Sequence, residues 1–199
     1  MIEFFLRAEG RPRRVGILAG SFNPPTLAHL ALARAALALV DEVVFLLPRA
    51  FPHKAYEGAS FLERIGMLVL VAEASPGFSV AAADGGLFIE IAAECRAVYG
   101  DAGLVFLCGR DAAERIVEWD YGRPDAFAGM LEAFELLVAA RGGEYRAPEQ
   151  FAGRIHSLAM ETGYDLVSAS QVRSRIAHGE AWEHLVPESI VDLVRRIYA

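Results

Sequence analysis

Cysteine is scarce in this chain, and its scarcity excludes two classes of protein. Only Cys95 and Cys108 occur among 199 residues. They are too few for a disulfide framework, and they lack the short paired spacing of zinc ligands. Both stand inside apolar runs, so we expect two buried thiols in a reducing compartment.

Long apolar runs are also missing. No run reaches the ~20 residues that a membrane-spanning helix requires. At the start of the sequence an apolar stretch precedes the basic residues, which is the opposite order from a secretory signal. These patterns predict a soluble, cytoplasmic protein that has no membrane partner.

Positive charge does not dominate the chain, whose formal net charge is −7. Proteins that bind nucleic acid through its phosphates need basic surface, so we expect no nucleic-acid partner. A small anionic ligand needs only a local positive pocket and stays open. Linkers and low-complexity tracts are absent, and 54% of the residues are apolar. We therefore expect one domain over residues 1–199, with residues 1–14 as an N-terminal extension.

Short apolar runs alternate with longer stretches of helical periodicity. The expected strands are Val15–Leu18, Val43–Leu47, Phe78–Ala81, Leu104–Cys108, Phe134–Ala139 and Ile155–Leu158. The expected helices are Ala28–Leu39, Phe61–Ala74, Leu87–Val98, Ala112–Val117, Gln171–His178 and Pro187–Tyr198. Short strands that are apolar throughout suggest burial on both faces, as in a parallel sheet. The alternation predicts a doubly wound α/β domain with a mainly parallel sheet, whose ligands lie at the carboxyl ends of the strands.

The segment before the first of these strands fits the alternation less well. Residues Ile2–Leu6 could add an edge strand. The arginines that follow are interpreted as a solvated arm without a function, and they are Arg7, Arg11, Arg13 and Arg14.

The loop after the first expected strand runs directly into an Ala- and Leu-rich helix. Gly20 lets the backbone turn tightly and approach a ligand. Thr26 and His29 are three residues apart at the helix start, so their side chains face the same way. A helix start offers N–H groups and a positive dipole, which suit an anion. The alternative is a plain helix cap with a polar residue in the first turn.

A similar pattern occurs near the other end of the chain. Ser170 is placed as the N-cap of the following helix, and Arg173 projects from the same face one turn later. Two helix starts, each with a hydroxyl and a cationic group, could hold a polyphosphate from both sides. An ordinary capped surface helix is the alternative for this segment alone.

Three further loops carry candidate residues. Lys54 follows the second expected strand and could reach a phosphate as a mobile charge, although such lysines are more often merely exposed. Gly109 and Asp111 follow the fourth expected strand, where glycine permits close approach to a flat base. Trp119 could stack on a ring. A capping aspartate and a buried tryptophan are the common alternatives.

Together these segments resemble the nicotinate/nicotinamide mononucleotide adenylyltransferase family, within the wider HxGH-type nucleotidyltransferases. GSFNPPTLAH is similar to the family loop GSFDPPHxGH, and FLLPRAFPHK is similar to its strand-to-HK segment. Arg64 and Met67 resemble its RxxM motif, and VSASQVR resembles ISSTxxR. The stretches IEIAAECRAVYGDAGLVFLCGRD, LLVAARGG and LVPESIVDLVRRIY also resemble the family in order and spacing. The resemblance covers Val15 to Tyr198 and implies a single Rossmann-like domain.

Two departures stand out. Thr26 and Ala28 replace the first histidine and the glycine of HxGH, and threonine occupies that first place in phosphopantetheine adenylyltransferases. Leu87 and Phe88 replace a tyrosine and a threonine that help the family hold the nicotinate ring. The side of the site that would bind ATP thus looks retained, and the acceptor side looks remodelled.

The resemblance implies transfer of AMP from ATP to a mononucleotide phosphate, with nicotinate mononucleotide as the acceptor and with release of pyrophosphate, in NAD biosynthesis. The implied catalytic residues are Thr26, His29, Lys54 and Arg173. The implied ATP-binding residues are Gly20, Ser21, Phe22, Asn23, Gly109, Ser168 and Ser170. The implied acceptor-binding residues are Gly85, Gly86, Asp111 and Trp119. Mg²⁺ would be held mainly by the ATP phosphates and water, so no protein metal site is expected.

Two alternatives stay open. The same transfer, of an adenylyl or a cytidylyl group, could go to another phosphate acceptor, such as a phosphopantetheine-like or sugar-type phosphate. The chain could instead be a nucleotide-binding protein without turnover, although the joint presence of His29, Lys54 and Arg173 favours an enzyme. No pattern in the sequence specifies an oligomeric state.

Overall fold

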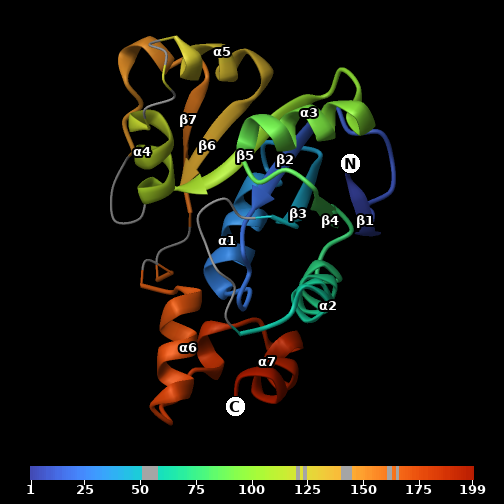
Figure 1. The fold of residues 1–199 in the computed structure, drawn as a ribbon, viewed down its shortest axis with the longest axis vertical. Coiled ribbons are helices and arrows are strands. Elements are labelled where there is room, and N and C mark those ends of the chain that lie inside the picture. Colours follow the sequence, from blue (N-terminus) through green and yellow to red (C-terminus); the bar gives the residue numbers. More distant parts are fainter. Residues whose placement is uncertain (51–57, 120–121, 123–124, 140–144, 161–162, 165) are drawn as a thin grey trace.

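The computed structural model describes residues 1–50, 58–119, 122, 125–139, 145–160, 163–164 and 166–199. A seven-stranded sheet forms its centre, in the order β1-β4-β3-β2-β5-β6-β7 (Figure 1). The strands are β1 (Glu3–Leu6), β2 (Arg14–Ala19), β3 (Glu42–Pro48), β4 (Phe78–Ala83), β5 (Gly103–Gly109), β6 (Glu135–Ala139) and β7 (Ile155–Leu158). Strands β2 to β7 pair in parallel, and β1 lies antiparallel to β4 at one edge. The predicted α/β fold with a mainly parallel sheet is confirmed.

Helices follow most of the strands. They are α1 (Leu27–Ala36), α2 (Phe61–Ala72), α3 (Phe88–Tyr99), α4 (Arg110–Glu118), α5 (Ala126–Ala133), α6 (Ala169–Ala177) and α7 (Val191–Tyr198). Short 3-10 turns lie at Glu149–Phe151, Glu183–Leu185 and Glu188–Ile190. None of the helices in the described part of the chain is long and apolar enough to cross a membrane.

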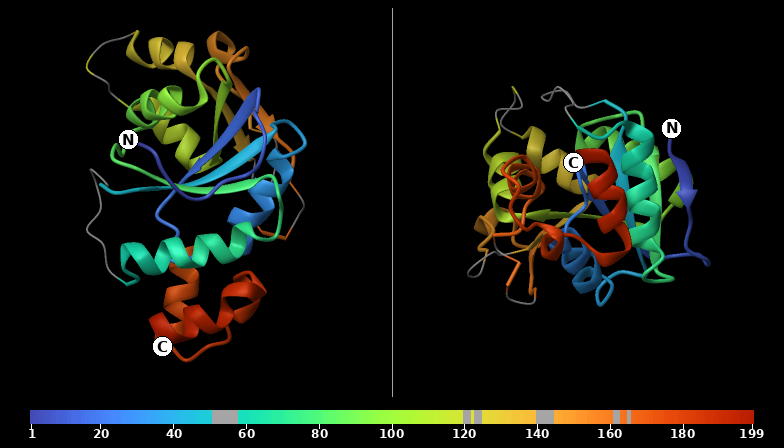
Figure 2. Two further views of the ribbon diagram at one scale, coloured as in Figure 1. Left: turned by 90° about the vertical axis from the view of Figure 1, so that its right-hand side faces the viewer. Right: turned by 90° about the horizontal axis from the view of Figure 1, so that it is seen from below.

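Both faces of the sheet are covered. Every residue of β3 and β4 is buried, as the unbroken apolar runs predicted. One core lies under α1, α2 and the C-terminal helices, and the other lies under α3, α4 and α5. Figure 2 shows these two helical layers on opposite sides of the sheet. The doubly wound arrangement leaves the carboxyl ends of the strands for ligands.

Two helical segments differ from the expected ones. No helix was expected at α5, whose central Gly129 weakens its helical propensity. Its buried Phe127 and Leu131, four residues apart, hold it to the core. The expected helix Pro187–Tyr198 is wrong in its first turn. Pro187 is extended, a 3-10 turn follows, and α7 begins only at Val191.

The N-terminal segment forms the edge strand that Ile2–Leu6 suggested. The solvated-arm interpretation is wrong for Arg14, which begins β2. The guanidinium of Arg14 donates to the carboxylate of Glu135 at 2.6 Å, because the parallel pairing of β2, β5 and β6 brings those strand starts together.

The two thiols are buried and free, as expected. Burial raises the pKa of Cys95 and of Cys108 to about 12. Because the thiolate is the reactive form, we expect the folded chain to resist iodoacetamide near pH 8, and the denatured chain to gain one adduct at each cysteine. Intact-mass measurement checks this. Rapid labelling of the folded chain would contradict it.

Candidate active site

The strand order reverses between β2 and β5. Strands β3 and β4 continue on one side of β2, whereas β6 and β7 continue on the other side of β5. A crevice at such a switch point, beyond the carboxyl ends of the strands, is the usual ligand position in this architecture. The segments that follow β2 and β5 therefore lie beside the candidate site.

The loop after β2, residues 20–26, has an unusual backbone. Phe22 adopts a left-handed conformation with a φ of 45°, which is uncommon for a bulky residue. Its ring is buried and lies edge-on to the rings of His29 and Phe45. A Cβ at Gly20 would lie 3.2 Å from this ring, so glycine makes room for it. Any contact between Phe22 and ATP would come from its main chain.

The helix start at Thr26 and His29 is confirmed. Thr26 is fully buried and is the N-cap of α1. Its N–H donates to Nδ1 of His29 at 3.0 Å, and its hydroxyl lies 2.8 Å from the same nitrogen. A backbone N–H can only donate, so Nδ1 accepts and the ring proton of the neutral histidine lies on Nε2. This arrangement holds His29 as an Nε2–H donor.

The second helix start is shifted by two residues from its predicted position. Ser168, and not Ser170, is the N-cap of α6, and its hydroxyl accepts from the N–H of Gln171 at 3.1 Å. Ser168 has the extended backbone of a cap, whereas Ser170 lies within the first turn and is exposed.

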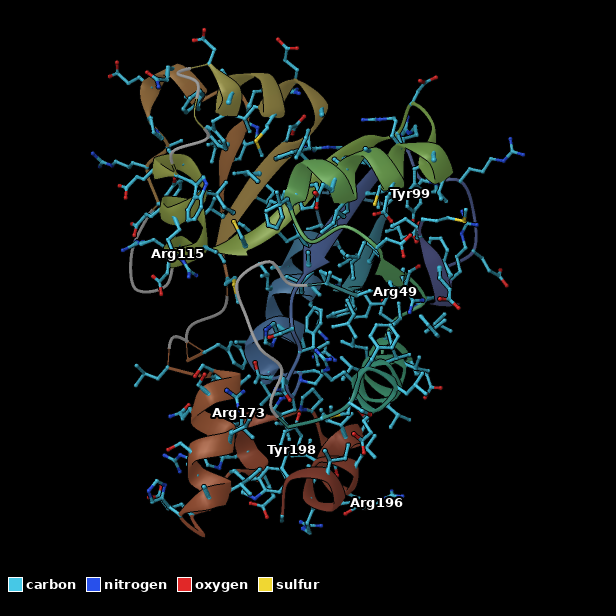
Figure 3. All side chains as sticks on the ribbon, viewed as in Figure 1. Arg49, Tyr99, Arg115, Arg173, Arg196 and Tyr198 are labelled. Carbon is cyan, nitrogen blue, oxygen red and sulfur yellow. The ribbon has the colours of Figure 1, made fainter. Side chains whose placement is uncertain are left out.

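Arg173 reaches the first loop. One guanidinium nitrogen donates to the main-chain oxygen of Asn23 at 2.5 Å, and the other lies 3.5 Å from the hydroxyl of Ser170. Arg173 and Asn23 lie 150 residues apart in the chain. Figure 3 shows Arg173 at the junction between α6 and the rest of the molecule. Arg173 thus joins the first turns of α6 to the loop that precedes α1.

Arg64 also lies at the loop, although no role was expected for it from the sequence. It is 3% exposed, and its guanidinium donates to the main-chain oxygens of Ser60 and Ser21 at 3.3 Å each. A sequence signal was available, since Arg64 falls on the same helical face as the buried Leu68 and Val71. An arginine on a buried face usually has a specific polar partner.

The segment after β4 carries the residues that were expected to bind the acceptor. The N–H of Gly85 donates to the carboxylate of Glu94 at 2.7 Å. The N–H groups of Gly86 and Leu87 donate to the carboxylate of Glu90 at 3.0 Å each. The two glycine amides expected to bind the acceptor are thus engaged by carboxylates of α3.

The residues at the two remodelled positions point in different directions. Phe88 packs into the core, stacked on Phe106 with ring centroids 4.3 Å apart. Leu87 is 44% exposed. Neither side chain offers a polar group to a ring.

The remaining predicted residues follow β5. Gly109 is the N-cap of α4, and Asp111 lies exposed in its first turn. Trp119 is the C-cap of α4 and is 56% exposed, which excludes the alternative of a buried tryptophan. Lys54 lies outside the described residues.

Comparison with known proteins agrees with this geometry. The family model described as cytidylyltransferase-like matches residues 17–175. A probable nicotinate-nucleotide adenylyltransferase of Chromohalobacter salexigens is 33% identical, over 96% of this chain and 99% of the relative. One of Bordetella petrii is 34% identical, over 92% and 97%.

The fold has solved counterparts. A Plasmodium falciparum nicotinic acid mononucleotide adenylyltransferase, complexed with NaAD, matches 92% of this chain and 95% of its own with a TM-score of 0.71 and 14% identity. At that identity the match supports the fold alone. The family is shown instead by the family model and by the curated relatives, which match nearly the whole chain. This chain is a nucleotidyltransferase that belongs to the nicotinate-nucleotide adenylyltransferase family.

Proposed function

We propose that this chain transfers AMP from ATP to nicotinate mononucleotide and releases pyrophosphate, as a step of NAD synthesis. One observation supports the proposal in addition to the family membership. His29 and Arg173 belong to helices that are far apart in the sequence, and both form hydrogen bonds with residues of the loop 20–26. A histidine N–H and a guanidinium beside one loop suit two neighbouring phosphates.

The reaction forms one bond and breaks one. A phosphate oxygen of the acceptor attacks the α-phosphorus of ATP, the bond between that phosphorus and the α,β-bridging oxygen breaks, and pyrophosphate leaves with the electron pair. The attacking oxygen is already anionic, so the protein need not supply a base. Its tasks are to align two anions and to stabilise charge on the transferring group.

Each residue of the ATP side has a role in this scheme. The Nε2–H of His29 donates to the α-phosphate, and Thr26 keeps the ring in the tautomer that can donate. Arg173, with the start of α6 at Ser168 and Ser170, holds the β- and γ-phosphates. Lys54 would add a further charge there.

The residues of this site fit Mg²⁺ that binds as a complex with ATP. In the described part of the chain, no group of three histidine, cysteine, aspartate or glutamate residues could hold a metal ion. Arg173 and the helix starts offer donors to anions, so the phosphates and water would supply the ligands. When bound, the ion neutralises phosphate charge.

A second candidate is transfer to an acceptor that carries no ring carboxylate. It is favoured by the carboxylates of Glu90 and Glu94, which already engage the amides of residues 85–87. The side chains of Leu87 and Ile89 beside them are apolar and partly exposed.

We therefore expect the enzyme to discriminate weakly between a charged and an uncharged ring. The kcat/KM values for nicotinate mononucleotide and nicotinamide mononucleotide should agree within roughly tenfold, because strong selection needs polar partners built for the differing group. Measurement of both values, with 4′-phosphopantetheine as a third acceptor, checks this. A strong preference for the nicotinate form that survives changes at residues 85–88 would show that ring recognition lies elsewhere.

Pyrophosphate release from ATP tests the proposed activity across these acceptors. Release that depends on a mononucleotide phosphate supports the proposal. Release with 4′-phosphopantetheine alone would favour the second candidate, and ATP binding without release would favour a binding protein.

A further inference from the structure

Asn23 joins four segments of the molecule. Its side-chain oxygen accepts from the hydroxyl of Tyr198 in α7 and, at 3.3 Å, from the N–H of Ala59 before α2. Its main-chain oxygen accepts from Arg173 in α6 at 2.5 Å. Asn23 itself is 8% exposed and belongs to the loop after β2. Asn23 was expected to bind ATP, and these contacts give it a structural task as well.

Tyr198 reaches this junction from the end of α7. Burial raises the pKa of its phenol, so the hydroxyl keeps its proton and donates to Asn23. Gly58 fits closely between them, with a φ of 93°; a Cβ there would lie 3.1 Å from both the Asn23 side-chain oxygen and a ring carbon of Tyr198. Figure 3 shows Tyr198 and Arg173 near each other where α6 and α7 meet the rest of the molecule.

We propose that Tyr198 is a positioning residue for ATP: its hydroxyl fixes Asn23, and Asn23 fixes the guanidinium of Arg173. This inference rests on the proposed function, since it takes Arg173 to hold the ATP phosphates. In this role the tyrosine needs no contact with a substrate. It acts by holding the carbonyl that aligns the arginine.

The chain of contacts predicts which kinetic constant changes. Without the hydroxyl, the Asn23 side chain loses a hydrogen-bond donor, and the loop 20–26 gains conformational freedom. The guanidinium of Arg173 is then no longer held in place before ATP binds, so ATP binding must order it. The free-energy cost of ordering Arg173 therefore weakens ATP binding. The acceptor segment at residues 84–88 is held separately, by its own contacts to α3. The KM for ATP should rise, whereas the KM for the acceptor should not.

The variant Tyr198→Phe removes only the hydroxyl. We expect its KM for ATP to rise about three- to tenfold, the range of one buried hydrogen bond, with kcat and the acceptor KM within about twofold of the wild type. Calorimetry with ATP alone should give a matching loss of affinity and needs no turnover.

Tyr99→Phe is the matched control. The hydroxyl of Tyr99 donates to the buried carboxylate of Glu42 at 2.8 Å, and Glu42 opens β3 at the opposite edge of the sheet from the candidate site. Both variants should lower the thermal midpoint, but only Tyr198→Phe should weaken ATP binding. If both variants change the KM for ATP equally, the role of Tyr198 is merely structural and the inference fails.

A double-mutant cycle tests the path through Arg173. In an Arg173→Ala background, Tyr198→Phe should change ATP affinity by less than about twofold, because the arginine through which it acts is gone. A full, additive loss would contradict this path. A wild-type chain that neither binds ATP nor releases pyrophosphate would refute the proposed function itself, whereas an active wild type with an unaffected Tyr198→Phe variant would overturn only this inference.

Discussion

Replacement of His29 by alanine should lower kcat by roughly two to three orders of magnitude, the scale of losing one preorganised donor to developing charge. The KM for ATP should change far less, because the contact tightens as charge builds on the α-phosphate. The Thr26 N–H donates to Nδ1 of His29, which places the ring proton on Nε2, the atom that we expect to face the α-phosphate.

Steady-state kinetics with saturating acceptor measures both constants. His178→Ala is the matched control, since His178 is an exposed residue at the end of α6 whose ring lies 2.7 Å from the main-chain oxygen of Ser174. It should keep the wild-type kcat. Near-wild-type turnover in His29→Ala would remove His29 from the chemistry.

The second large effect is expected at Arg173. Arg173→Ala should weaken ATP binding by about 10- to 100-fold, because hydrogen bonds to charged groups contribute roughly 1.5–3 kcal/mol each. Arg173→Lys should recover only part of this loss, since an ammonium keeps the charge but cannot bond two partners in the plane of a guanidinium.

Calorimetry with ATP provides the measurement for Arg173. Arg196→Ala is a suitable control, because Arg196 is an exposed arginine on α7 and Figure 3 shows it away from Arg173. Unchanged ATP affinity in Arg173→Ala would exclude the residue from the site.

The parts of the site that are local in sequence could be predicted. Residues 15–29 contain a strand, a glycine, a helix cap and a histidine in direct succession. The short spacing between the cap and the histidine determines that their side chains meet. Thr26 and His29 are in contact as expected. Short-range rules of turn and cap chemistry suffice for such a segment.

Cap chemistry alone was not enough at the second helix start. Ser168 and Ser170 are both suitable caps, and the sequence offers no local reason to choose between them. The burial of Val172 and the contact of Arg173 with Asn23 select the earlier start. Packing against distant residues decides such a choice.

Long-range contacts could not be predicted. Arg64 meets Ser21, and Tyr198 meets Asn23, only after folding, and no spacing in the sequence links position 23 to position 198. The contact between the Leu87 amide and the carboxylate of Glu90 does follow a local pattern in the sequence. Glu90 lies three residues after the N-cap Leu87, which is the spacing of a capping box. The pattern was not recognised because a capping box usually has serine or threonine at the N-cap, and Leu87 is apolar.

The most direct test of the proposed activity is to follow each phosphate of ATP. The chain is given ATP labelled with ³²P at either the α- or the γ-phosphate, together with nicotinate mononucleotide, and the products are separated. We expect the α-label in nicotinate adenine dinucleotide and the γ-label in pyrophosphate. A γ-label on the acceptor, or an α-label that stays in ATP at every acceptor concentration, would contradict adenylyl transfer.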